Sequence, residues 1–183
     1  MEVFGTIVRF FQNGGLFMYP IVIILAIGLA IAIERYIYLT RSESGNRKLW
    51  EKLQPLLSSG DYAGAFEVAS KSDAAVGQVL AYGISRLRTS TNRQDVEMSM
   101  EESLLEVTPQ LEKRAPYLAV LANVATLLGL LGTIMGLIAG FTAVANVNPA
   151  EKADLLSASI SVAMNTTAFG LIVAIPLLLL HAI

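Results

Sequence analysis

The sequence of 183 residues has no cysteine and a single histidine, His181. The chain can therefore form neither a disulfide nor a thiolate. We also find no His/Cys/Asp/Glu cluster with metal-ligand spacing, no phosphate-binding glycine loop, and no nucleophile with a base near it in sequence. These absences predict that the protein is not an enzyme and holds neither a metal nor a cofactor. The formal net charge of −2 indicates no nucleic-acid partner.

Charge is also absent from two long stretches of the chain. No Asp, Glu, Lys or Arg occurs at positions 115–150 or at positions 155–183. Each stretch is longer than the roughly 20 apolar residues that a helix needs to cross a bilayer. Together they predict two membrane-spanning helices joined by a short charged turn, the second of them capped by Asp154 or Ser157.

A third uncharged run lies near the N-terminus, at positions 16–33, and ends at Glu34 and Arg35. A signal peptide is the alternative interpretation. It fits poorly because Glu2 and Arg9 precede the run and no small-residue cleavage site follows it. Since 54% of all residues are hydrophobic, we predict an all-α integral membrane protein. Its three transmembrane helices are expected to be long and to extend into a cytoplasmic helical domain.

The basic residues predict the orientation of the chain. Of 13 Lys and Arg residues, only Arg9 and Lys152 lie outside the segment from Arg35 to Arg114. The positive-inside rule places that segment in the cytoplasm and the N-terminus outside. We predict an interfacial helix over 1–15, transmembrane helices over 16–39, 116–146 and 155–183, a cytoplasmic helical region over 40–115, and a periplasmic turn over 147–154.

The cytoplasmic region has helix signals throughout and no strand pattern. The run Ser-Ser-Gly at positions 58–60 predicts the end of a helix, and Asp61 predicts the N-cap of the next one. The stretch after Asn92 is rich in helix formers. We predict that it forms one long helix, bent at Pro109 and Pro116, which continues into the second span.

Acidic residues gather in that stretch. The simplest interpretation is a solvated helix face, and a docking surface is the alternative. The residues concerned are Glu97, Glu101, Glu102 and Glu106.

Small and hydroxyl-bearing residues recur along the second and third spans. The glycines predict close helix packing in lipid; they are Gly129, Gly132, Gly136, Gly140 and Gly170. A hydroxyl in lipid can bond back to the carbonyl four residues earlier, but both spans carry a polar stripe, and an amide needs partners in the membrane. We therefore predict a partly wet cavity lined by Thr126, Thr133, Ser161, Asn165, Thr166 and Thr167.

Such a cavity has no group of its own that exchanges a proton near neutral pH, which would require a carboxylate or an imidazole. The second and third spans offer only His181, at the extreme end of the third. If protons move here, we expect the titrating group to come from a partner subunit.

Two runs resemble the MotA/TolQ/ExbB proton-channel family: LLGLLGTIMGLIAGF at 127–141 and SVAMNTTAFGLIVAIP at 161–176. The run SGDYAGAFEVA at 59–69 is also similar to the cytoplasmic segment of these proteins. A single span precedes that segment, as in the ExbB/TolQ branch, whereas the MotA branch has two.

The resemblance implies a homopentamer in the bacterial inner membrane around a dimer of a single-span, ExbD-like partner. That partner supplies a membrane aspartate, and proton flow drives a motion that a TonB-like protein passes to outer-membrane transporters. The resemblance also implies that Thr133 and Thr167 line the lumen, with Thr166 as the neighbouring candidate. A TolQ-like motor for envelope constriction and a purely structural membrane scaffold are the alternatives.

The sequence departs from the family pattern at two positions. Many ExbB and TolQ members carry Glu where this chain has Val162, and a Pro is common where it has Thr126. The first difference puts in doubt any proton route that uses that Glu. Members usually continue into a cytoplasmic C-terminal helix, so the resemblance leaves open that this sequence is shortened at its C-terminus.

Overall fold

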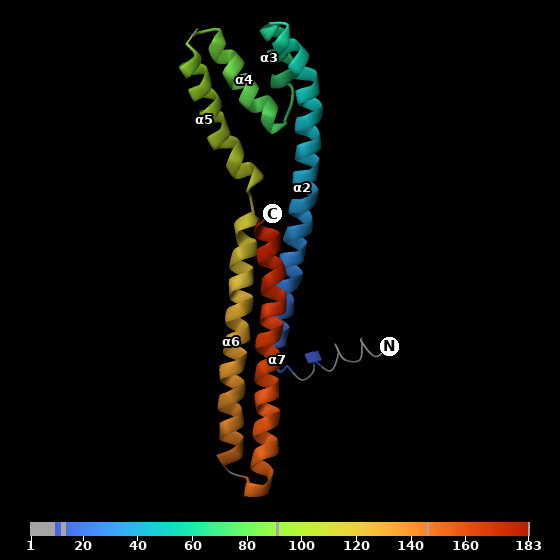
Figure 1. Cartoon of the computed structure of the whole chain (residues 1–183), viewed down its shortest axis with the longest axis vertical. Coiled ribbons are helices and arrows are strands. Elements are labelled where there is room, and N and C mark those ends of the chain that lie inside the picture. Colours follow the sequence, from blue (N-terminus) through green and yellow to red (C-terminus); the bar gives the residue numbers. More distant parts are fainter. Residues whose placement is uncertain (1–9, 12–13, 91, 146, 183) are drawn as a thin grey trace, which may run out of the picture. The chain divides into compact units, whose positions relative to one another are not determined.

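The computed structural model describes residues 10–11, 14–90, 92–145 and 147–182. These residues form helices and no strand, as predicted. The helices are α2 (Met18–Ser58), α3 (Tyr62–Ser70), α4 (Ala75–Leu87), α5 (Arg93–Leu111), α6 (Ala115–Ala145) and α7 (Pro149–Ala182) (Figure 1). Most of the interfacial helix predicted over 1–15 lies outside the described residues.

Three of these helices, α2, α6 and α7, are long and apolar enough to cross a membrane. Each also has an 18-residue window with a mean hydropathy of 2.0 or more. Much of their surface is exposed and apolar, which suits contact with lipid tails or with other membrane helices. The chain is therefore a multi-pass membrane protein.

The chain divides into two compact units. Residues 1–33 and 114–183 form one, which we call the membrane unit. Residues 34–113 form the other, which we call the helical unit. Helix α2 contributes its first part to the membrane unit and the rest to the helical unit.

In the membrane unit, α6 and α7 run side by side, and the first part of α2 packs on them (Figure 1). The helices are apolar on all sides, so it is side-chain size that decides which faces meet. Small residues of α6 and α7 lie inside, and larger aliphatic ones fill the gaps. This core consists of Ile21, Ile24, Leu118, Ala122, Ala125, Val173, Ala174 and Leu177.

Helix α7 begins at Pro149, earlier than the predicted start at 155. Proline is favoured at the first position of a helix because its missing N–H has no partner there anyway, and Glu151 in the first turn suits the helix dipole. The charged residues expected in a turn, among them Asp154, are therefore helical. The prediction that Asp154 or Ser157 caps this helix is wrong.

The helix predicted to run unbroken into the second span is in fact interrupted. Helix α5 ends at Leu111 and α6 starts at Ala115, with Arg114 between them at a φ of 70°. Pro116 has no N–H to donate to the carbonyl four residues earlier, and its ring would clash with that carbonyl. Pro109, in contrast, is accommodated inside α5.

In the helical unit, Arg35 holds the end of α5 close to α2. The Arg35 side chain is only 6% exposed, and its Nη1 donates a hydrogen bond to the carbonyl oxygen of Lys113. Its guanidinium lies 4.5 Å from the centre of the Tyr38 ring. A cation at this place also complements the partial negative charge of a helix C-terminus.

The core of the helical unit joins α2, α3 and α4 through Leu49, Leu53, Ala65, Ala69 and Ile84. Helix α2 stops where Gly60 takes a φ of 78°, which costs a glycine little. The Asp61 carboxylate then accepts a hydrogen bond of 3.0 Å from the Gly64 N–H. The predicted stop and N-cap are both confirmed.

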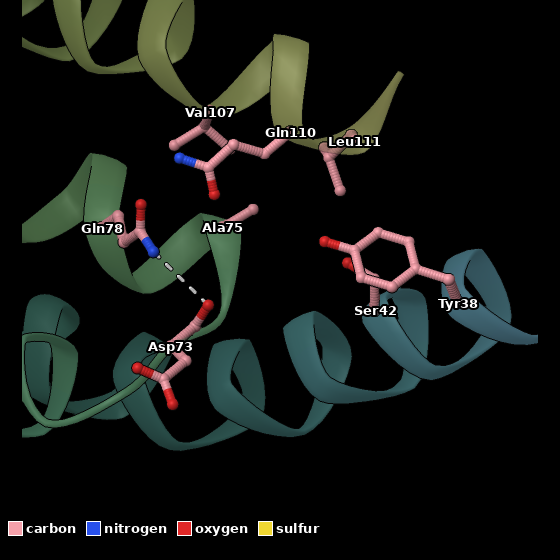
Figure 2. Close-up of a pocket in the computed structure, with 8 residues that line it drawn as sticks. All are labelled: Tyr38, Ser42, Asp73, Ala75, Gln78, Val107, Gln110 and Leu111. Atoms are coloured by element: carbon pink, nitrogen blue, oxygen red, sulfur yellow. Dashed lines mark hydrogen bonds between the residues drawn. The ribbon is translucent and has the colours of Figure 1, made fainter. Parts of the chain in front are cut away.

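A small pocket of about 30 Å³ lies between α2, α4 and α5 of this unit, with room for about one water molecule (Figure 2). Tyr38 and Ser42 of α2 face Val107, Gln110 and Leu111 of α5 across it. The residues that line the pocket thus show which turns of α2 and α5 lie opposite each other in this antiparallel pair.

Replacing Asp61 with Ala removes the acceptor of the Gly64 N–H. We expect the free energy of unfolding of the helical unit to fall by about 1 kcal/mol. Denaturant unfolding followed through Trp50, the only tryptophan in the chain, measures it. Asp61→Asn keeps an acceptor at the same place and serves as the control, so equal losses in both variants would show that the cap contributes nothing.

Candidate functional site

The two spans α6 and α7 approach backbone to backbone at Gly129 and Gly170. A Cβ added to Gly170 would lie 2.8 Å from the Ala125 carbonyl oxygen and 3.1 Å from the Gly129 Cα. A Cβ on Gly129 would lie 3.2 Å from both the Thr166 carbonyl oxygen and the Thr167 Cα. Backbone atoms cannot move aside as the end of a side chain can, so only glycine fits this crossing.

The other glycines of α6 lie along the same contact. A Cβ on Gly132 would meet the Thr166 side chain, one on Gly136 would lie 3.0 Å from the Ala163 Cβ, and one on Gly140 would meet the Ser159 side chain. The structure thus places all five glycines singled out in the sequence where α6 faces α7.

Next to this crossing, Thr133 of α6 and Thr167 of α7 place their hydroxyls in direct hydrogen-bond contact. The Thr167 hydroxyl also lies 2.9 Å from the Gly129 carbonyl oxygen. The Thr133 hydroxyl lies 3.2 Å from the same oxygen and 3.3 Å from that of Ala163. Each hydroxyl has one proton, so the pair can adopt several donor arrangements and keeps spare acceptor capacity.

Both threonines of this hydroxyl pair are half-buried. Thr166 differs sharply from its neighbour. It is 1% exposed, and its hydroxyl lies 2.6 Å from the carbonyl oxygen of Gly14 and 2.9 Å from that of Val162. Of the two adjacent candidates, Thr167 joins Thr133, whereas Thr166 holds the segment that precedes α2.

The remaining candidates are not gathered at the hydroxyl pair. Thr126 is exposed, lies two turns before Thr133, and bonds back to the Ala122 carbonyl oxygen at 3.1 Å. Ser161 and Asn165 lie two positions before Ala163 and Thr167, which is about 200° round the helix. They therefore point away from α6.

Asn165 is half-buried, and its amide has no hydrogen bond among the residues that the structure describes. The amide of Asn123 of α6 also lacks a described partner, although Asn123 is not among the candidates predicted from the sequence. It is exposed, one turn before Thr126, and the described residues give its amide no hydrogen bond either. The signal is present in the sequence, since an amide within an uncharged span demands a polar partner.

The site has no ionisable side chain of its own. Between 115 and 150 and from 155 onward the chain has no Asp, Glu, Lys or Arg. His181, at the end of α7, lies 3.0 Å from the Ala115 carbonyl oxygen, far along both helices from the hydroxyl pair. The hydroxyl pair can accept and donate hydrogen bonds but cannot titrate.

Two pKa shifts occur outside the spans. The Lys71 ammonium lowers the pKa of Glu67, and the Glu97 carboxylate raises the pKa of Arg93.

Substituting Ala for Gly170 forces a methyl group against the Ala125 carbonyl. We expect a loss of about 1–3 kcal/mol in the free energy of unfolding, because the backbones must separate. Thermal unfolding of the detergent-solubilised chain, followed by circular dichroism, measures it.

Gly45→Ala is the control, because Gly45 lies in helix α2 with no atom within 4 Å of its added Cβ. It should be neutral or slightly stabilising, by up to about 1 kcal/mol. If Gly170→Ala were as well tolerated as Gly45→Ala, the close crossing would not exist.

Comparison with known proteins gives several relatives of this chain. It is 28% identical over its full length to an ExbB homologue of Methanothermobacter thermautotrophicus described as a biopolymer transport protein. It is 25% identical over 91% of its length to an ExbB-like 3 protein of Synechocystis, covering 79% of that protein. It is 42% identical over 59 residues to the biopolymer transport protein exbB1 of Vibrio cholerae.

The chain spans 64% of the length of the Methanothermobacter protein, and the Vibrio match covers 26% of that protein. The sequence profile of the MotA/TolQ/ExbB proton channel family matches residues 71–183, which include α6, α7 and both threonines of the hydroxyl pair. This match covers more than half of the chain and includes two of the three spanning helices. The chain belongs to the MotA/TolQ/ExbB proton channel family.

Proposed function

We propose that this chain is the proton-channel and stator subunit of an ExbB-type motor in the bacterial inner membrane. Its N-terminus is periplasmic and its C-terminus cytoplasmic. An ExbD-like single-span partner completes the proton path, and the motor uses the proton motive force to energise TonB-dependent outer-membrane transport. The chain itself catalyses no reaction.

The observation that carries this proposal is the hydroxyl pair without an acid. Thr133 and Thr167 meet in the middle of a long uncharged contact, and both are half-buried. Hydroxyls placed there can solvate a proton that another group delivers, but they cannot bind and release it near neutral pH. A carboxylic acid on a partner's membrane helix would supply the missing step.

In this proposal Thr133 and Thr167 line the proton path, and Thr126 extends it along the same flank of α6. Ser161 and Asn165 face another direction and line a second polar surface, where Asn165 needs a partner from outside the chain. Thr166 acts indirectly, by holding Gly14. The glycines set the helix separation that keeps the two hydroxyls together.

The partners in this proposal are further copies of the chain, to a total of five, an ExbD-like subunit with a membrane Asp, a TonB-like protein and membrane lipids. The names of the relatives, which refer to biopolymer transport, favour the ExbB role. A TolQ-like motor and a structural scaffold are the alternatives. Val162, where many ExbB and TolQ members carry Glu, fits a less typical branch of the family and does not distinguish ExbB-like from TolQ-like roles.

Changing Thr167 to Val keeps the side-chain shape but removes the hydroxyl. We expect proton flux through the assembled complex in liposomes to fall at least tenfold, on the order of the loss of one well-placed hydrogen bond. Thr167→Ser should retain most of the flux. A pH-sensitive dye inside the liposomes reports the flux, and the mass of the complex shows whether assembly is intact.

Thr142→Val is the matched control, because the Thr142 hydroxyl, on an exposed face, bonds to the Ile138 carbonyl oxygen and to no other group among the described residues. It should leave the flux unchanged. Normal assembly and full flux in Thr167→Val would remove the assigned role of the hydroxyl pair. A complex that conducts protons without any second protein would contradict the need for an external acid.

A further inference from the structure

Two exposed charged faces of the helical unit have no role in the proposed proton path. One belongs to α2, where Arg41, Lys48 and Lys52 lie seven and four positions apart, on one side of the helix. All three are exposed, and none has an ion pair or hydrogen bond among the described residues. We call these three residues the basic face.

The second face belongs to α5 and is its chemical complement. Met98 and Leu105 are 67% and 77% exposed and lie two turns apart on one side of the helix. Glu101 and Glu102 flank the line between them, and both are exposed without an ion pair among the described residues. We call these four residues the acidic face. An apolar centre with a charged rim is typical of a docking surface.

The two faces lie at matching heights in the helical unit. Ser42 of α2 and Val107 of α5 line the same small pocket, and the helices run in opposite directions (Figure 2). Because every helix rises about 1.5 Å per residue, Lys48 is level with Glu101, and Ser44 is level with Leu105. No ion pair among the described residues joins the two faces within the chain.

We propose that the two faces meet between copies of this chain, with the basic face of one copy docked on the acidic face of the next. The contact joins two different patches, so it closes into a ring when the rotation between copies closes. A ring axis parallel to α2 and α5 keeps the copies level, so that Lys48 of one copy meets Glu101 and Glu102 of its neighbour. The inference rests on the homo-oligomer of the proposed function and adds the surfaces that build it.

A second copy accounts for both faces together, which a lipid surface or a different protein does not. A membrane of anionic lipids would attract the basic face but repel Glu101 and Glu102, and it would leave Met98 and Leu105 uncovered. A basic partner protein would cover the acidic face alone. A second copy of the chain carries both faces in the same register.

Charge reversal tests the proposal on the full chain in detergent. Lys48→Glu with Lys52→Glu reverses the basic face, and Glu101→Lys with Glu102→Lys reverses the acidic face. We expect each double variant to associate about tenfold more weakly, with a loss that shrinks at high salt, since such pairs are exposed. All four changes together restore opposite charges and should recover association. Lys71→Glu lies outside both faces and should have no effect.

Disulfide trapping tests the geometry of the contact. Because the sequence has no cysteine, only the introduced cysteines can form disulfides. A chain with Ser44→Cys and Leu105→Cys should form a ladder of covalent oligomers on oxidation, up to the size of the ring. The control pairs Leu105→Cys with Glu43→Cys, which points about 100° away round α2, and should form no ladder.

The possible results separate this inference from the proposed function. An oligomer that persists in every reversed variant and gives no ladder would overturn the docking surfaces while leaving the homo-oligomer intact. A wild-type chain that stays monomeric would overturn both. Weaker binding to anionic vesicles in Lys48→Glu/Lys52→Glu, with an unchanged oligomer, would assign the basic face to lipid and overturn the proposal.

Discussion

The close crossing of α6 and α7 at Gly129 and Gly170 is the constraint on which the membrane unit depends. Lipid tails are as apolar as leucine, so apolar spans gain little from hiding hydrophobic side chains from each other. Their association relies on van der Waals contact and on hydrogen bonds, and both need backbones that come close. A single methyl group at Gly170 would collide with the Ala125 carbonyl oxygen. The same closeness brings Thr133 and Thr167 within reach of each other and of the Gly129 carbonyl.

The hydroxyl pair supports two interpretations, helix packing and proton conduction. Its bonds across the crossing tie the two spans together, which a packing role alone would explain. Yet the pair has two protons and more oxygen acceptors than two protons can satisfy, and both side chains are only half-buried. Within lipid, a hydroxyl oxygen with a free acceptor position favours contact with a hydrogen-bond donor. A protonated carboxyl group on another helix is such a donor, and the family to which the chain belongs conducts protons. A packing motif and a proton path can therefore be the same set of atoms.

The spans are predictable from the sequence because charge is so costly in a bilayer that an uncharged apolar run of roughly 20 residues is typical of a membrane helix. The cap at Asp61 is predictable because that interaction is local. Prediction fails where a distant segment decides. The sequence places both Thr166 and Thr167 in the predicted cavity, but Thr167 bonds to Thr133 whereas Thr166 bonds to the Gly14 carbonyl oxygen, 152 residues away in sequence. The helix breaks before Pro116, where the sequence predicted only a bend. Proline removes a backbone hydrogen bond in a bend and in a break alike. The break also requires the positive φ of Arg114, and no glycine in the sequence signals it.

The exposed spans also bear on how copies of the chain would recognise one another in the proposed homo-oligomer. Apolar helix surfaces in lipid discriminate weakly between partners, since no burial of water-exposed area favours one arrangement over another. Specific assembly then requires polar groups whose mispairing is costly. Within the spans, the described polar candidates without a hydrogen bond are few, notably Asn123 and Asn165. In the proposed contact, opposite charges at matched heights on α2 and α5 would supply attraction in one register and repulsion in others. In the proposed assembly, the water-exposed helices would select the neighbouring copy, and the uncharged spans would form the proton path.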